Sequence, residues 1–132
     1  MSSILALVSK KAFDSVRVNG RSLQLGELWP VDQYLSKTPA LRTLEAGGAL
    51  FLVTVRPPDE RLWLLAILQD PRFDGSKWTC AQNTTPVREI SHLVPKFRFA
   101  NGTGLNPAPG KLGMSLQTPR VLSAEDEQWL SL

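Results

Sequence analysis

The sequence predicts an α+β fold that is mainly β, in the form of a small barrel of about five to six mostly antiparallel strands flanked by short helices. Three observations lead to this prediction. The segments 49–55 and 62–68 are apolar on both of their alternating faces. Helix-capping residues open short stretches between and after the strand candidates. Prolines and glycines gather in the connections, above all in NGTGLNPAPG at 101–110.

Length and composition indicate one folded domain. The chain has 132 residues, 42% hydrophobic and 20% charged, which is enough for a single core, so we expect one domain spanning 1–132. The single cysteine, Cys80, excludes an internal disulfide, and the apolar run 4–8 is too short for a signal peptide or a membrane span. We therefore expect a cytoplasmic protein that does not contact a membrane.

The first part of the chain is predicted to contain a strand, a hairpin and a helix. Residues 4–8 form the first strand, and short apolar pieces within 13–28 surround an Asn-Gly turn at 19–20. Thr38 then offers a helix cap, followed by a proline at the first helical position, and Gly47 ends the helix.

Two further helices are predicted in the second part of the chain. Thr85-Pro86 opens a short helix whose apolar stripe ends at Pro95. Ser123 begins the last helix, where Asp126 completes a capping box and the neighbouring acids complement the helix dipole. Strands are expected between these helices, at 49–55, 62–68, 77–82, 96–99 and 112–118.

The pair 49–55 and 62–68 shows why a barrel is expected. The connection RPPDER forces antiparallel pairing, because a parallel crossover needs about a dozen residues or more. In the alternation of a regular strand, Trp63 and Leu65 share a face with Phe51, and the other face is apolar as well. Each face requires a covering layer. A barrel meets this requirement, since one face fills its interior while helices cover the other.

Charge is unevenly distributed along the chain. All 15 basic residues but only nine of the 12 acidic ones precede residue 125, and the segment 90–124 contains no acid. The surplus favours a polyanionic partner, whereas a solvated basic face is the ordinary alternative in soluble domains.

The sequence contains no pattern typical of catalysis or metal binding. His92 and Cys80 lack a zinc-ligand spacing, and GTGLNPAPGK departs from the phosphate-loop pattern in its glycine spacing and in the Leu112 that follows it. No nucleophile elbow occurs, and the acids fall in turns and helix starts, where solvated carboxylates are normal. We therefore expect a protein that is not an enzyme and uses no cofactor and no metal.

Aromatic residues among basic ones indicate binding of nucleobases, because flat rings beside Arg or Lys provide stacking platforms. Trp63 lies within an apolar strand and Trp129 on the last helix, positions typical of core packing. Trp29 precedes Pro30 in a polar segment, which fits a pocket wall and a core position equally. The other rings of this group are Tyr34, Phe73 and Trp78.

The order of motifs along the chain adds a family resemblance. LVSK at 7–10 is followed by a Trp-containing loop at 29–34, a helix ending LRTLEAGG, and the segments LFLV and WLLAIL. TPVREISHL and GKLGMSLQTPRVLSAEDEQW then complete the chain. This order resembles the PUA-like barrels, in particular the EVE domain and the related YTH domain, over nearly the whole chain. The likeness depends on the order of the elements and includes no single diagnostic motif.

The sequence departs from the family around the nucleotide pocket. SKKA at 9–12 stands where the family has Lys-Ser-Glu-Pro, and Gly48 stands in place of an Asp. The family's Arg-Asn pairs after the tryptophan are replaced by DQ at 32–33 and SK at 36–37. The resemblance therefore carries the fold over better than the ligand.

The resemblance implies a non-enzymatic module that binds DNA or RNA and holds a modified, flipped or single-stranded base in a small aromatic pocket. The rival interpretation is a protein-interaction or structural barrel, a homo-oligomer or a partner-binding protein, with no nucleotide ligand. The implied base-pocket residues are Ser9, Lys10, Trp29, Tyr34, Thr38 and Thr54, and the implied phosphate-binding residues are Lys37, Arg56 and Arg120.

Overall fold

A five-stranded mixed sheet forms the centre of the molecule. The computed structural model describes residues 2–18, 20–106 and 108–131. The strand order of the sheet is β10-β1-β5-β6-β9, in which β1 pairs with β5 in parallel and the remaining neighbours are antiparallel. Its strands are β1 (Ile4–Leu7), β5 (Ala49–Arg56), β6 (Arg61–Gln69), β9 (Arg88–Glu89) and β10 (Arg120–Val121).

Smaller sheets and short helices surround this central sheet. One is the hairpin of β2 (Arg17–Val18) and β3 (Arg21–Ser22), and the other has the order β4-β8-β7. The predicted class, α+β and mainly β, is confirmed. The strands of the three-stranded sheet are β4 (Gln33–Tyr34), β7 (Arg72–Phe73) and β8 (Trp78–Thr79). Of the strand predicted at 77–82, only β8 forms. The helices are α1 (Lys10–Asp14), α2 (Leu112–Ser115), α3 (Ala124–Ser131) and the 3₁₀ helices η1 (Pro39–Ala46) and η2 (Ser91–Lys96).

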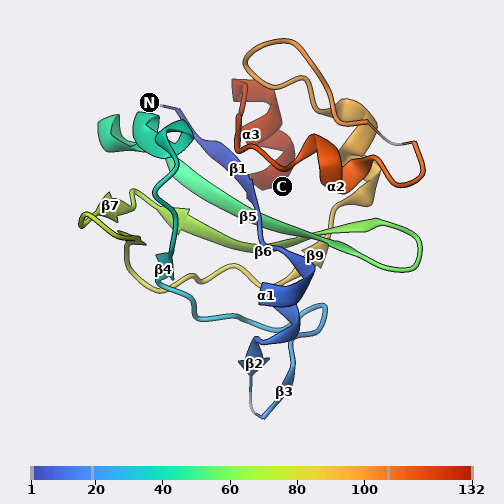
Figure 1. Ribbon diagram of the computed structural model, residues 1–132, viewed down its shortest axis with the longest axis horizontal. Helices are drawn as coiled ribbons and strands as arrows, with labels where there is room; N and C mark the ends of the chain where they lie inside the picture. The colour runs from blue at the N-terminus through green and yellow to red at the C-terminus, as the bar shows by residue number, and fades with distance from the viewer. Residues whose placement is uncertain (1, 19, 107, 132) are drawn as a thin grey trace.

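Both faces of the central sheet are covered, as the two-sided apolar pattern of β5 and β6 requires. Figure 1 shows these strands crossing the middle of the molecule, with α2 and α3 on one side and α1 with the β2–β3 hairpin on the other. On one face a C-terminal cluster packs β1, β5 and β6 against the later part of the chain. The residues that this part contributes are Leu93, Val94, Phe97, Phe99, Leu105, Leu112, Leu116, Leu122 and Leu130.

The opposite face of the sheet carries an N-terminal cluster. Its covering residues come from α1, the β3 hairpin end, η1 and the three-stranded sheet. Strand pairing among the described residues leaves the central sheet open, with β9 and β10 as its edges. The segments of the C-terminal and N-terminal clusters cover its two faces. The buried residues contributed by the covering segments are Phe13, Leu23, Leu41, Leu44, Trp78 and Val87.

A β-bulge changes which side chains of β6 share a face. The register with β5 shifts just before Val53, which pairs with Leu64, and Leu65 is the extra residue. Leu64 therefore joins the C-terminal cluster, whereas Trp63 and Leu65 pack in the N-terminal cluster. The prediction that Trp63 and Leu65 lie on the same face as Phe51 is wrong, because one additional residue inverts the alternation.

The helix predicted to open at Thr85 begins six residues later in the chain. Strand β9 first pairs with the outer edge of β6, and the amide of Ile90 donates to the carbonyl of Leu62 at 2.8 Å. The free edge of β6 thus keeps this segment extended through Glu89, and η2 starts at Ser91. Pro95 lies within η2 and does not end it.

The strands predicted at 96–99 and 112–118 do not form. Phe99 has a backbone φ of 43°, which lies outside the extended region. Leu112 and Leu116 are both buried, and their four-residue spacing is that of one helical face, so this segment turns into α2. The edge strand that pairs with β1 is β10 instead.

Other predicted elements are confirmed. The first strand and the hairpin form, although Asn19 of its turn lies outside the described residues. Thr38 caps η1, and Gly47 follows it with a φ of 101° that favours glycine. In α3 the amide of Ser123 donates to the Asp126 carboxylate at 3.0 Å, and the amide of Asp126 donates to the Ser123 hydroxyl at 3.2 Å, which is the expected capping box.

Candidate nucleic-acid interface

A cleft opens where β1 ends. It consists of two adjoining hollows of about 570 and 390 Å³, which share Leu7, Ser9 and Tyr34 as lining residues. The larger hollow continues past Trp29, and the smaller continues past Thr38. We call the combined space the Tyr34 cleft. Its size is within the range of sites that bind small molecules.

The register of the central sheet explains where the cleft lies. Arg120 of β10 pairs with Leu5 of β1 in antiparallel fashion, so the residues before Arg120 run beside the last residues of β1. The segment 116–119 consequently lines the smaller hollow opposite the end of β1. Ser9 follows directly and caps α1 by accepting a hydrogen bond from the amide of Ala12 at 3.1 Å.

Tyr34 separates the two hollows. It lies on β4, and its hydroxyl donates to the carbonyl of Leu7 at 3.1 Å. Burial raises the pKa of Tyr34, because the phenolate would lose hydration, and the hydroxyl therefore remains a donor at neutral pH. The tyrosine fixes the end of β1 and supplies a half-buried ring to both hollows.

The Trp29 loop is held by a buried amide. The side-chain amide of Asn83 donates to the carbonyl oxygens of Trp29 at 2.9 Å and Thr85 at 3.0 Å, and its oxygen accepts from the amides of Ile67 and Thr85, both at 3.0 Å. All four hydrogen-bonding positions of this side chain are satisfied. The half-buried Trp29 ring is therefore fixed against the N-terminal cluster while it lines the larger hollow.

The structure brings together four of the six predicted base-pocket residues. Ser9, Trp29, Tyr34 and Thr38 all line the Tyr34 cleft. Thr54 is buried, and its hydroxyl donates to the carbonyl of Val8 at 2.8 Å, which places it beneath the cleft and away from any ligand. The sixth, Lys10, is exposed at the start of α1 and lines neither hollow.

The three predicted phosphate ligands have different environments. Lys37 is exposed and lies between Ser36 and Thr38 in the chain, but it lines neither hollow itself. Arg56 lies 3.5 Å from Asp14 and 4.3 Å above the Phe13 ring, so its charge already faces a carboxylate and an aromatic ring, although its Nη1 makes no hydrogen bond among the described residues. Arg120 lies over Phe99 and donates to Ser115 and Thr103, which turns it toward the C-terminal side of the molecule.

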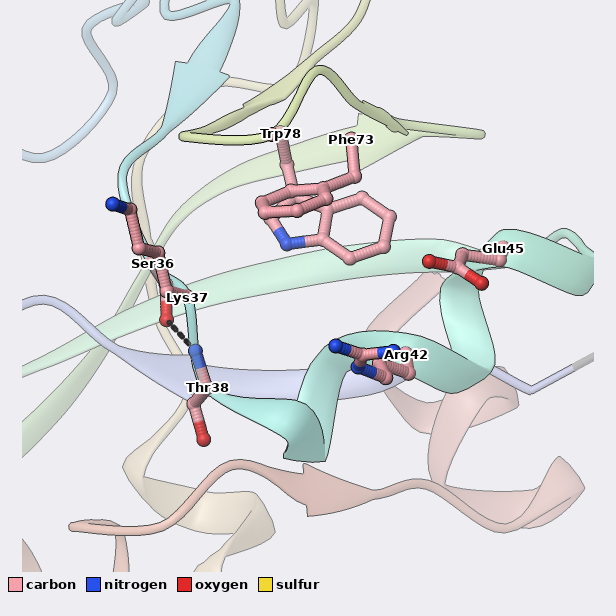
Figure 2. Close-up of a pocket in the computed structure, with 8 residues that line it drawn as sticks. Ser36, Lys37, Thr38, Arg42, Glu45, Phe73 and Trp78 are labelled. Carbon is pink, nitrogen blue, oxygen red and sulfur yellow. Dashed lines mark hydrogen bonds between the residues drawn. The ribbon is translucent and has the colours of Figure 1, made fainter.

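A second pocket, of about 310 Å³, lies between η1 and the β7–β8 hairpin (Figure 2). Ser36 and Thr38 line this pocket as well as the smaller hollow, so the two spaces share a wall. We call it the Phe73 pocket. The sequence analysis placed Phe73 and Trp78 in the aromatic group but did not predict that they meet η1. The signal available in the sequence was the pair of charged residues Arg42 and Glu45, which lie three positions apart in that helix.

Other chemistry is not apparent in this part of the molecule. Within 2–18, 20–106 and 108–131, no group of three or more His, Cys, Asp or Glu residues is arranged to hold a metal ion. The helices of these ranges are all too short or too polar to cross a bilayer. Burial, and secondarily Asp32, raise the pKa of the Cys80 thiol, which disfavours the reactive thiolate. Comparisons with protein-family models, curated proteins and solved structures give no match to this chain.

Proposed function

We propose that this protein is a non-enzymatic nucleic-acid-binding module related to the PUA-like, EVE-like domains, in which the Tyr34 cleft holds one base of a DNA or RNA strand. The observation that carries this proposal is the convergence of Ser9, Trp29, Tyr34 and Thr38 on one cleft. Ser9 follows the first strand, whereas the other three come from the segment 29–38, and all four match the base-pocket positions that the family resemblance implies.

Energetics favour a base that is already unpaired. Stacking on an aromatic ring contributes about 1–3 kcal/mol, whereas flipping a base out of a duplex costs a few kcal/mol. These free energies nearly cancel, so a single-stranded or loop nucleotide is the better substrate. A methyl group on the base would gain about 0.8 kcal/mol by filling apolar space, which supports a preference for a modified base.

Contacts to phosphate would supply the remaining affinity. Lys37 is exposed between Ser36 and Thr38, which line the cleft, and, within the described part of the chain, it takes no part in an ion pair. Binding should weaken as salt rises, with a slope of about −0.7 in log–log terms for each phosphate contact on a single strand. Lys37→Ala should make this slope less negative by about 0.7, the contribution of one phosphate contact.

The test is binding of fluorescent single-stranded DNA and RNA, with and without base methylation, measured by anisotropy at about 50 and 200 mM salt. Trp29→Ala is expected to weaken binding roughly five- to hundredfold. The matched control is Trp129→Ala, because Trp129 packs on the opposite face of the sheet. Negligible and equal binding of every oligonucleotide by the wild-type protein would contradict the proposal.

A protein-binding surface is the second candidate, and one observation favours it. Leu35, which lines the cleft, is 71% exposed, and Leu25 and Leu28 are also exposed. Apolar residues at a cleft rim can bind a second protein or a second copy of this chain. In that case light scattering should detect an oligomer that Leu35→Ser disrupts, while oligonucleotides have no effect.

A further inference from the structure

The Phe73 pocket offers chemistry that the Tyr34 cleft lacks. Figure 2 shows the rings of Phe73 and Trp78 on one side of the pocket and the side chains of Arg42 and Glu45 on the other. It therefore combines an aromatic wall with two cations, Lys37 and Arg42, and one carboxylate. Phe73 is 37% exposed, so part of its ring is open to a ligand.

The 3₁₀ geometry of η1 aligns the two charged groups. Side chains three residues apart eclipse in a helix with three residues per turn, so Arg42 and Glu45 project along one stripe. Leu41 and Leu44 form the corresponding buried stripe. Both charged side chains are exposed and, among the described residues, neither forms an ion pair within 4.0 Å. Their hydrogen-bonding groups remain available to a ligand.

The aromatic wall is continuous with the Tyr34 cleft. In the three-stranded sheet Tyr34 pairs with Trp78, and Trp78 pairs with Phe73, so the three rings project from the same face in one row. The Phe73 and Trp78 ring centroids are 5.2 Å apart. The hairpin that positions Phe73 is fixed by Asp74, whose carboxylate accepts from the amides of Ser76 and Lys77 at 2.9 Å each. Trp78 is only 2% exposed and supports the row from below, so the rings available for stacking on bases are Tyr34 and Phe73 at its two ends.

We propose that the Phe73 pocket binds the base of the nucleotide adjacent to the one in the Tyr34 cleft, and that it selects guanine. This inference rests on the proposed function. Guanine presents two neighbouring N–H donors on its pairing edge, and the Glu45 carboxylate only accepts hydrogen bonds. Adenine and cytosine present one amino donor beside a ring nitrogen that accepts, which faces the carboxylate unfavourably.

The charges of the pocket also orient the nucleotide. Glu45 repels a phosphate, so the base and not the backbone faces it. Lys37 lines the Phe73 pocket between Ser36 and Thr38, the two residues that both spaces share, and attracts the connecting phosphate. Arg42 donates to the acceptor oxygen and nitrogen on the other edge of guanine, a pairing that arginine makes frequently.

The first test locates the site with mononucleotides. Guanosine and adenosine monophosphate are titrated separately into the full chain, and amide NMR shifts are followed. Guanosine monophosphate is expected to shift amides of 37–46 and 72–79 more than adenosine monophosphate does. Shifts confined to 7–9 and 29–35, or no shifts at all, would overturn the subsite. Because amides of the pocket and amides of the cleft are followed separately, shifts confined to the cleft contradict the subsite alone and leave the proposed function standing.

The second test measures selectivity in a strand. Short thymidine oligonucleotides with guanine or adenine at one scanned position are compared by anisotropy. The wild-type protein is expected to prefer guanine by about tenfold at one position, and Glu45→Gln should abolish this preference while thymidine binding remains. Glu125→Gln, an exposed change at the start of α3, is the matched control and should keep the preference. Equal affinity for the guanine and adenine strands, or an unchanged preference in Glu45→Gln, would refute the proposal.

Discussion

The two faces of the central sheet are covered in different ways. The C-terminal face is covered by η2, α2, α3 and the segments joining them. Among the described residues, Trp129 is the one half-buried aromatic ring that packs against this cover. The N-terminal face is covered by short strands, loops and single helical turns. There Trp29, Tyr34 and Trp63 are all half-buried.

This difference shows how the type of cover affects where aromatic rings stay accessible. Consecutive helices place leucines and phenylalanines over the sheet and bury them fully. Loops and two-residue strands cover less area per residue, so larger rings are needed to close the surface and their edges remain accessible. The Phe73 pocket and the larger hollow of the Tyr34 cleft lie on the loop-covered side, whereas a hollow of about 650 Å³ on the helix-covered side is lined by a single, buried aromatic ring, Phe99.

The largest expected effect comes from opening the helix-covered face. Phe97 is fully buried and stacks on Phe99 with centroids 5.6 Å apart, so Phe97→Ala should lower the free energy of unfolding by about 3–5 kcal/mol. The comparison variant on the other side is Phe73→Ala, which should cost only about 1 kcal/mol because the ring is partly exposed. Chemical denaturation measures both. Equal losses would remove the contrast between the two faces.

The second prediction concerns the anchoring of the C-terminal cover. Asp126 is buried and accepts hydrogen bonds from the amides of Ser123 at 3.0 Å and Arg98 at 3.2 Å. Asp126→Ala leaves both amides without their acceptor and should destabilise the protein by about 1–3 kcal/mol. Glu125→Ala, at an exposed neighbouring position, is the control in the same denaturation experiment. A stable Asp126→Ala protein would indicate that α3 contributes little to the cover.

The smallest expected effect lies in the loop-covered face. Tyr34→Phe removes the hydrogen bond to the carbonyl of Leu7 and should cost about 0.5–1.5 kcal/mol, while a ring remains for stacking. Oligonucleotide affinity should consequently change less than in Trp29→Ala. A loss of binding as large as that of Trp29→Ala would show that the hydroxyl contacts the ligand.

The same side chain gives a pH prediction. Burial raises the pKa of Tyr34 in the folded protein. Below the pKa of an unfolded tyrosine both states are protonated, and stability does not depend on this group. Above about pH 10 the unfolded state ionises first, so the free energy of unfolding falls as pH rises. Tyr34 is the only tyrosine of the chain, and its phenolate absorbance can therefore be titrated directly. A midpoint at or below the ordinary value would contradict the burial of this ring.

Much of the fold could be predicted because its signals are local. The capping of η1 by Thr38 and the capping box of Ser123 and Asp126 each involve residues within a few positions of one another. The two-sided burial of β5 and β6 follows from their composition. The bulge at Leu65 was not predictable in this way, because it depends on how two strands register against each other and against both covers.

The candidate site was predicted in part. The rings of Trp29 and Tyr34 were recognised from their context, and they line the cleft. The roles of the cations were not recognised from the sequence, because whether a guanidinium is free depends on its spatial neighbours. Arg56 meets Asp14 across a sequence separation that no local pattern encodes, and the charged stripe of Arg42 and Glu45 becomes a pocket wall only through the distant β7–β8 hairpin.

The sequence by itself determined the class of fold, the positions of the caps and the existence of a sheet apolar on both faces, because these depend on backbone preferences and side-chain periodicity over a few residues. The tertiary structure alone decided which side chains occupy each face of β6, which charges are already paired, and where half-buried rings leave space. Those outcomes depend on contacts between segments far apart in the chain, such as the hydroxyl of Thr54 and the carbonyl of Val8, and their energies exist only once the segments have packed.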